Sequence, residues 1–422
     1  MPEQQAASPP AKTSIREVLA QPRMLVILVM GAASGFPNLI SESVLQAWLK
    51  DYGVSNLKIG LLGYVSMPYV LKFLWAPFLD RFPLPLLGRR RGWIIVFQIL
   101  LVPTIALLAF QDPSNGLLGV AICATAVTFF SASQDIVIDA YRTDLAEAKE
   151  RGPASAATNL GFRASSYIAF AIALIVADYY GWRTGIVLLA GAMCLFMIAT
   201  ILAPEPAYRT RAPGSLRESV VEPLKELLAT KGALALIFLV FIFKFGDALA
   251  LKLVTPFLMD VGFSKTEVAL VAKLVATWAS LAGAAIGGIW MVRLGLWNSM
   301  IVFGILQAIT NLSYGLLAFA GKNYTLMIFA VAIENLTHAM GNVALVALIM
   351  AMCDVRFSAF QYALLSVLAT TPRYVLSGFA GWLADAGGWP TYYVCSFLLG
   401  LPGLIAVWYL RDRIRALDIH RL

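Results

Sequence analysis

The sequence predicts an all-α protein that crosses a membrane twelve times, with its helices in two related halves of six. Three observations predict this fold class. The chain of 422 residues is 60% hydrophobic and 13% charged, with a mean hydropathy of +0.78. Soluble domains are nearer half apolar and a quarter charged. Twelve segments are long and apolar enough to span a bilayer, and short motifs of the first half recur in the second.

The elements follow from the apolar segments in order. Residues 1–23 are polar and rich in proline, without the features of a signal peptide, so we expect a cytoplasmic tail there. A spanning helix needs about 20 mostly apolar residues. Such segments occur at 24–49, 57–79, 92–110, 116–141, 154–178, 184–203, 232–257, 266–292, 297–320, 324–351, 358–384 and 390–410. The charged, proline-rich stretch 204–231 predicts a cytoplasmic linker between bundles at 24–203 and 232–410, and 411–422 a second tail.

The basic residues predict the orientation. With both termini in the cytoplasm, the cytoplasmic segments hold about 21 of the 32 Lys and Arg residues and the opposite side holds about 5, as the positive-inside rule requires. The net charge of +8 therefore gives no reason to expect a nucleic-acid partner. The four cysteines are scattered without a CxxC pair, so we expect no disulfide framework, metal site or cofactor.

An internal repeat relates the two halves. Residues 51–55 (DYGVS) recur as 260–264 (DVGFS), and 177–182 (ADYYGW) recur as 384–389 (ADAGGW). Arg163 likewise corresponds to Arg373. Three matches in order, at nearly one offset, indicate a duplicated transporter. Two parallel halves with a substrate site between them at mid-membrane are the arrangement of the major facilitator transporters.

The loop after the second segment supports this arrangement. Asp80 and Arg81 are followed by a short insert and then by Gly88 and residues 89–91 (RRR). Major facilitator transporters carry a Gly-x-x-x-Asp-Arg-x-Gly-Arg-Arg loop there, which this chain matches in part, with Ala76 at the first glycine position. We expect Asp80, Arg81 and Arg89 to gate the cytoplasmic face, although the arginines alone also fit plain positive-inside charge.

The whole pattern resembles the AmpG muropeptide permeases, a branch of the major facilitator superfamily. The resemblance lies in the stretches 34–37 (SGFP), 45–49 (LQAWL), 68–69 (PY), 71–77 (LKFLWAP), 80–81 (DR), 88–93 (GRRRGW), 133–142 (SQDIVIDAYR), 244–247 (KFGD) and 361–366 (QYALLS). It implies a permease of the bacterial inner membrane that imports GlcNAc-anhydroMurNAc peptides from periplasm to cytoplasm, with protons and by alternating access. This import serves peptidoglycan recycling, which feeds β-lactamase induction and hence antibiotic resistance in some bacteria.

Other functions remain as alternatives. Compact relatives of similar length look like siderophore permeases, so the cargo is either an anionic glycopeptide or another anionic solute. A membrane enzyme would need a catalytic cluster on a loop, but the loops are short and carry no nucleophile motif, so we expect no enzyme. A sensor would need a soluble signalling domain, which the sequence does not contain. We expect a monomer that interacts with its cargo, with protons and with the lipid bilayer.

The fourth segment carries the main polar stripe. Ser131, Asp135, Asp139 and Arg142 lie at i, i+4, i+8 and i+11, on one face of a helix. Charges within a membrane are unfavourable unless they pair or face water, which makes them functional candidates. Asp135 lies deepest, and a carboxylate in a low-dielectric cavity is suited to loading and releasing protons. Asp139 and Arg142 are expected to form a gate or a static bridge, and Asp139 is also a proton-coupling candidate. Gln134 is expected to face the cargo.

The tenth segment carries a matching stripe. Glu334, His338 and Asn342 are spaced i, i+4 and i+8, with Asn335 beside them as a cargo-binding candidate. A Glu–His pair suits a proton relay because histidine titrates near neutral pH, although His338 is alternatively a structural hydrogen-bond donor. Glu334 competes with Asp135 as the proton carrier. It occupies the position equivalent to Gln134, so we expect these two to face the cargo from opposite halves.

The first two segments add binding candidates. Asn38, Glu42 and Gln46 follow one face of the first segment at i, i+4 and i+8. Glu42 either lines the cavity or pairs with a lysine. Lys72 lies in the middle of the second segment and either binds a substrate anion or pairs with Asp135 or Glu42.

The second half contributes its own charges. Lys244 and Asp247, at i and i+3 in the segment equivalent to the first, can satisfy each other. Lys252 lies two turns further along the same segment. Arg163 and Arg373 are expected to clamp a substrate carboxylate through paired guanidinium hydrogen bonds.

Overall fold

A computed structural model describes residues 21–82, 84, 88–146, 151–206, 222–229, 232–353 and 358–419. Every regular element within these ranges is helical, which confirms the all-α prediction. Ten helical stretches of this described part are long and apolar enough to cross a membrane. Two of them, Lys265–Ala320 and Gln361–Tyr409, contain a glycine with left-handed backbone, Gly295 and Gly388. Divided at these glycines, the ten stretches give twelve segments, the number that the sequence predicts.

The first half is a bundle in which several segments consist of consecutive short helices. Its elements are α2 (Pro22–Gly35), η1 (Ile40–Val44), α3 (Leu45–Asp51), α4 (Asn56–Leu62), η2 (Gly63–Ser66), α5 (Met67–Leu71), η3 (Lys72–Leu74), α6 (Ala76–Arg81), α7 (Arg89–Ala109), α8 (Leu118–Leu145), α9 (Arg151–Tyr180) and α10 (Trp182–Leu202). The first spanning segment thus comprises α2, η1 and α3, and the second runs from α4 to α6. These segments begin and end within a few residues of the predicted bounds.

The second half repeats this arrangement. Its elements are α12 (Ala233–Ile242), α13 (Phe245–Lys252), α14 (Val254–Asp260), α15 (Lys265–Glu267), η7 (Val268–Ala272), α16 (Lys273–Ala320), α17 (Tyr324–Met352), α18 (Ser358–Thr370), α19 (Pro372–Val375) and α20 (Ser377–Tyr409). Two short helices lie outside the bundles, α11 (Glu222–Ala229) in the expected linker and α21 (Arg411–Ile419) after the last segment. Residues 1–20 of the expected first tail, residues 207–221 and 230–231 of the linker, and residues 420–422 lie outside the described residues.

A break in the first segment is fixed by its neighbours. Pro37 has no backbone N–H, so the carbonyl of Ala33 loses its helical partner. The side chain of Gln134 on α8 replaces it, with its Nε2 donating to Ala33 O at 2.9 Å. On α9, Ser166 Oγ donates to the carbonyl of Gly35 at 2.7 Å. Irregular backbone at membrane depth is tolerated where protein groups satisfy it in this way.

The helices α2 and α9 cross at close range through glycine. A Cβ atom at Gly35 would overlap the backbone of Phe162, and one at Gly31 would overlap that of Thr158. Small residues at a membrane helix interface let two backbones approach closely and gain van der Waals contact. The position of the first segment in its half therefore depends on these glycines.

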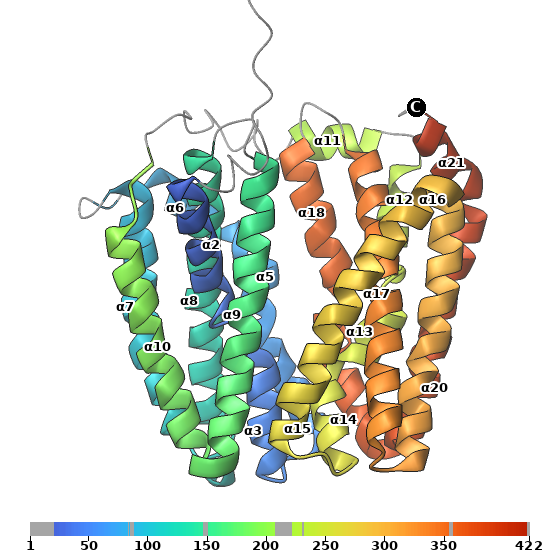
Figure 1. Ribbon diagram of the computed structural model, residues 1–422. Helices are drawn as coiled ribbons and strands as arrows, with labels where there is room; N and C mark the ends of the chain where they lie inside the picture. The colour runs from blue at the N-terminus through green and yellow to red at the C-terminus, as the bar shows by residue number, and fades with distance from the viewer. Residues whose placement is uncertain are drawn as a thin grey trace, which may run out of the picture.

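The two halves stand side by side and meet at one end (Figure 1). At that end lie α3, α14 and α15, and we call it the closed end. The halves diverge toward the other end, where α11, α18 and α21 lie (Figure 1). The contacts between the halves at the closed end include those of α3 with α14, α4 with α20 and α9 with α15.

The glycine crossing gives a first prediction. We expect Gly35→Leu to destabilise the protein by about 1–3 kcal/mol, because the added side chain forces α2 away from α9. The measurement is the melting temperature of the purified protein in detergent. Gly191→Leu is the matched control, since Gly191 is exposed on α10 with nothing within 4 Å of an added Cβ. Equal melting temperatures for the two variants would contradict this account of the crossing.

Candidate functional site

At the closed end, an aspartate of the second half caps a helix of the first. The carboxylate of Asp385 accepts hydrogen bonds from the backbone N–H groups of Asn56 (3.0 Å) and Leu57 (2.8 Å). These are the first two residues of α4, and Ser55 before them makes no side-chain cap. A carboxylate at a helix N-terminus satisfies free N–H groups and favours the helix dipole. Because Asp385 comes from α20, this cap joins the two halves.

The equivalent aspartate of the first half makes the equivalent contact. Asp178, near the end of α9, accepts from Thr266 Oγ1 at 2.7 Å and lies 3.8 Å from Lys265 Nζ. Residues 56 and 57 correspond to 265 and 266 at the repeat offset of 209. Here Ser264 already caps the helix through a capping box, so Asp178 takes side-chain donors instead.

A second pair of aspartates forms ion pairs across the same interface. Lys50 of the first half lies 2.7 Å from Asp260 of the second, and Lys265 lies 2.9 Å from Asp51. A tryptophan of its own half donates to each carboxylate: Trp182 to Asp51 at 2.7 Å and Trp389 to Asp260 at 3.0 Å. The sequence analysis used these aspartates only as marks of the repeat and missed their role. The available signal was their recurrence at the end of the first segment of each half, with Lys50 next to Asp51 and Lys265 five residues after Asp260.

The predicted stripe on α8 forms a group within the first half, the Asp135 cluster. Lys72 of η3 forms an ion pair with Asp135, which is one of the alternatives that the sequence left open. Ser34 Oγ of α2 donates to the other oxygen of Asp135 at 2.5 Å. Asp139 lies 3.2 Å from Arg142 Nη2, and its side chain is 47% exposed. This last pair lies on one helix and does not connect the halves.

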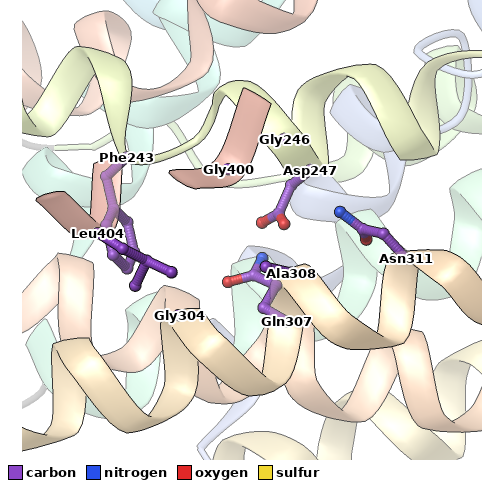
Figure 2. A pocket seen from close by; sticks show the side chains of 9 residues that line it. All are labelled: Phe243, Gly246, Asp247, Gly304, Gln307, Ala308, Asn311, Gly400 and Leu404. Atoms are coloured by element: carbon purple, nitrogen blue, oxygen red, sulfur yellow. The ribbon is translucent and has the colours of Figure 1, made fainter. Parts of the chain in front are cut away.

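A corresponding group within the second half is the Asp247 cluster. Lys244 Nζ donates to Asp247 Oδ2 at 3.0 Å, as the spacing predicts. His338 Nδ1 lies 3.2 Å from the same oxygen and 3.3 Å from Gln307 Nε2. A small pocket adjoins this cluster, and Figure 2 shows Asp247, Gln307 and Asn311 directed into it from α13 and α16. Both polar atoms of Asn311 lack a hydrogen-bond partner among the described residues.

The structure corrects two expectations for Glu334. It is 0% exposed, and neither carboxylate oxygen has a hydrogen-bond partner in the described part of the chain. His338 turns to Asp247, so the expected Glu334–His338 pair does not form. Gln134 is equally buried and holds the carbonyl of Ala33. Neither Glu334 nor Gln134 therefore faces cargo in this state, because each points into the interior of its own half.

Glu42 on η1 reaches across to the second half. Its Oε1 lies 2.9 Å from Arg373 Nη2 and 3.7 Å from Lys252 Nζ, so of its alternatives the structure has the ion pair. Gln46 Nε2, one turn further, donates to the backbone carbonyl of Lys252 at 3.2 Å. Lys273, at the start of α16, lies within electrostatic reach of the same carboxylate. The sequence analysis did not include this lysine among the site residues.

The remaining candidates are less engaged. Arg163 is exposed on α9, whereas its repeat partner Arg373, with a side chain that is 42% exposed, pairs with Glu42. Asn38 is half-buried beside Pro37, and its carbonyl lies 3.4 Å from Ser41 Oγ. Asn335 Nδ2 donates to the carbonyl of Val331 on its own helix at 2.8 Å.

The basic loop is held within the first half. Arg89 begins α7, and the next two arginines pair with Asp144 and Glu205 of the same half at 2.8 and 3.3 Å. The side chains of Asp80 and Arg81, the other gating candidates of this loop, lie outside the described residues, although both belong to α6. The gating role of the loop stays a prediction.

Comparisons with known proteins agree with this geometry. The family model of the Major Facilitator Superfamily matches residues 24–373. The chain is 41% identical over 397 residues to the anhydromuropeptide permease of Escherichia coli, and the match covers 94% of the chain and 81% of that permease.

Solved structures of low sequence identity share the fold. A bacterial homolog of the human lysosomal transporter Spinster, in an inward-facing and unoccupied conformation, superimposes with a TM-score of 0.73 at 15% identity and covers 94% of this chain and 97% of its own. A D-xylose–proton symporter gives a TM-score of 0.70 at 15% identity, with 92% and 96% covered.

The ion pairs at the closed end give a second prediction. Lys50→Glu places two acidic groups together, and we expect it to shift the population away from the closed end by about two- to five-fold, since a partly exposed pair contributes about 0.5–1 kcal/mol. The double variant Lys50→Asp/Asp260→Lys, which exchanges the two charges, should restore the population of the closed end. The measurement is the distance distribution between spin labels at Tyr52 and Ala386, in a variant without the native cysteines.

Lys58→Glu is the control for this experiment, because Lys58 is an exposed lysine of α4 at the same end. It changes the charge equally without removing the Lys50–Asp260 pair. If it had the same effect as Lys50→Glu, the specific ion pair would not stabilise the closed end.

Proposed function

The chain belongs to the major facilitator superfamily, and we propose on this premise that it imports anhydro-muropeptides from the periplasm to the cytoplasm, with protons, by alternating access. The cell would use the imported GlcNAc-anhydroMurNAc peptides in peptidoglycan recycling. The observation that carries this proposal is the 41% identity to the Escherichia coli anhydromuropeptide permease over 94% of the chain. The relatives are transporters, and the proposed activity involves no chemical reaction of the cargo.

The basic residues support an inward-facing orientation of this state in a bacterial inner membrane. The arginines at the start of α7 and the basic helix α21 lie at the end where the halves diverge (Figure 1). Lys and Arg favour the cytoplasmic side of a membrane. The closed end then faces the periplasm and the divergent end faces the cytoplasm, where imported cargo would leave.

The Asp135 cluster supports proton coupling. Its carboxylate joins three segments, because Lys72 comes from η3 and Ser34 from α2. Protonation of Asp135 would remove the charge that holds Lys72, and Asp139, within electrostatic reach, would become the nearest acidic partner. Proton loading would thereby loosen the contacts of α8 with α2 and η3. Alternating access requires contacts that form in one state and break in the other, and this cluster would provide them.

Glu334 remains the second proton candidate. An ionised carboxylate that is buried without a partner is strongly unfavourable. Glu334 is fully buried, so it would enter an ionised state only if a neighbouring group moved toward it. In the proposed cycle it competes with Asp135 as the proton carrier, and substitution of each residue distinguishes the two.

Proton coupling gives a third prediction. Asp135→Asn should abolish the dependence of uptake into proteoliposomes on an imposed pH gradient. An asparagine amide neither takes up nor releases a proton at the pH of the assay. Exchange of labelled for unlabelled substrate at equal pH should continue, which separates lost coupling from misfolding. Glu334→Gln is the matched comparison. Normal pH-driven uptake by Asp135→Asn would rule out Asp135 as the carrier.

The cargo gives a fourth prediction. Uptake of labelled anhydro-muropeptide should be inhibited at least tenfold by unlabelled anhydro-muropeptide and unaffected by a ferric siderophore at the same concentration. The siderophore alternative predicts the reverse pattern. Proteoliposomes with an imposed pH gradient provide the measurement, and empty liposomes provide the background.

A further inference from the structure

Two cations of the second half lie beside one carboxylate of the first, and a third lies within electrostatic reach. Arg373 Nη2 and Lys252 Nζ lie 2.9 and 3.7 Å from Glu42 Oε1, and Lys273 lies within electrostatic reach of both Glu42 and Arg373. Three positive groups and one negative group leave two positive charges without a counter-charge. We call these four residues the Glu42 cluster.

The cations of this cluster have unused hydrogen-bond donors. The side chain of Lys252 is 0% exposed, and its Nζ has no hydrogen-bond partner among the described residues. Arg373 Nε is buried and equally unpartnered within the described ranges. The ammonium group of Lys273 lies 4.5 Å from the centre of the Phe170 ring, a contact that satisfies no donor. Lys252 is buried, whereas the side chain of Arg373 is 42% exposed and Lys273 is half-buried. Partly desolvated cations without a full counter-charge favour an incoming anionic group.

The neighbouring carboxylates are engaged elsewhere. Asp135 pairs with Lys72, and Asp247 is held by Lys244 and His338. Glu42 balances the site only in part. Its Oε1 lies 2.9 Å from Arg373 Nη2, but its single negative charge faces three cations. The site is therefore built for more negative charge than Glu42 provides.

The backbone around the cluster is specialised as well. Glu42 lies in η1 and Lys273 directly follows η7, and both of these elements are π-helices. π-helical turns are rare and are frequent at functional sites. They reorient the side chains that they carry, which here brings a carboxylate and an ammonium group from opposite halves to one place.

We propose that Lys252, Lys273 and Arg373 form a binding site for carboxylate groups of the substrate, and that Glu42 holds this site as an internal counter-ion while no substrate is bound. The inference rests on the proposed function, because muropeptides carry several carboxylates on their peptide stem. A guanidinium with two ammonium groups binds a carboxylate through charge-assisted hydrogen bonds.

Substrate binding would then act on the interface between the halves. Glu42 belongs to the first half and its three partners belong to the second, so the cluster bridges the halves near the closed end. A substrate carboxylate that binds Arg373 competes with Glu42 and weakens this bridge. The site therefore couples recognition of an anionic peptide to the opening of the closed end.

The experiment measures binding to the purified full-length protein by calorimetry. The two probes are a GlcNAc-anhydroMurNAc tetrapeptide with free carboxylates and the same molecule with its carboxylates amidated. We expect the wild type to bind the free form at least tenfold more tightly than the amidated form. Lys273→Gln should weaken binding of the free form about tenfold, which corresponds to about 1.4 kcal/mol, and leave the amidated form unchanged.

Two further variants separate binding from folding. Glu42→Gln should bind the free form several-fold more tightly, because the internal competitor is gone, whereas a purely structural role predicts weaker binding. Lys273→Arg should retain the preference for the free form. Lys58→Gln, which removes an exposed lysine of α4, should match the wild type.

The outcomes distinguish the two proposals. Equal affinity of the wild type for the free and amidated forms overturns the carboxylate site and leaves muropeptide transport standing. An unchanged free-form affinity in Lys273→Gln removes that lysine from the site and overturns the inference as stated. Failure of the wild type to bind either form overturns the proposed function together with the inference.

Discussion

An ionised side chain within a membrane needs an opposite charge or water, and the arrangement of this protein depends on how that need is met. The Asp135 and Asp247 clusters meet it inside one half each, so a movement of the halves does not by itself separate their ion pairs, whereas protonation of Asp135 would. The Glu42 cluster meets it only across the interface, and only in part. The relative position of the two halves is therefore electrostatically sensitive at Glu42 and comparatively insensitive at the other two clusters.

Breaks in the helices carry these charges. Lys72 lies in η3, Glu42 in η1 and Arg373 in α19, a helix of four residues between two longer ones. Each break frees backbone groups that a neighbouring segment must satisfy, as Gln134 does for Ala33. In the sequence Gln134 is a candidate for cargo binding, but in the structure it hydrogen-bonds a backbone carbonyl of the broken first segment. Discontinuous helices in transporters commonly combine these two roles, since the same irregularity exposes groups for binding.

The features that could be predicted from the sequence are those that depend on spacing along one helix or on the repeat. The twelve segments follow from apolar length, and the pairs Lys244–Asp247 and Asp139–Arg142 follow from a spacing of three residues. The partner of Lys72 could only be narrowed to two carboxylates, because the choice depends on how separate helices are placed. The expectation for Gln134 and Glu334 was wrong for the same reason, since a polar residue on a helix does not reveal which side faces the interior. The contacts at the closed end also require one conformational state, which the sequence does not specify.

The aspartates that close the interface have a consequence for the origin of the protein. Asp178 and Asp385 occupy equivalent positions in the two halves. Asp385 contacts the start of α4 in the first half, and Asp178 contacts the start of the equivalent helix α15 in the second. In a symmetric pair of identical six-helix proteins, one aspartate in the ancestral sequence would have made both contacts at once, because a two-fold interface uses each residue twice. Gene duplication and fusion then allowed the two copies to diverge. The present asymmetry, with a backbone cap on one side and a capping box with side-chain donors on the other, is what such divergence leaves behind.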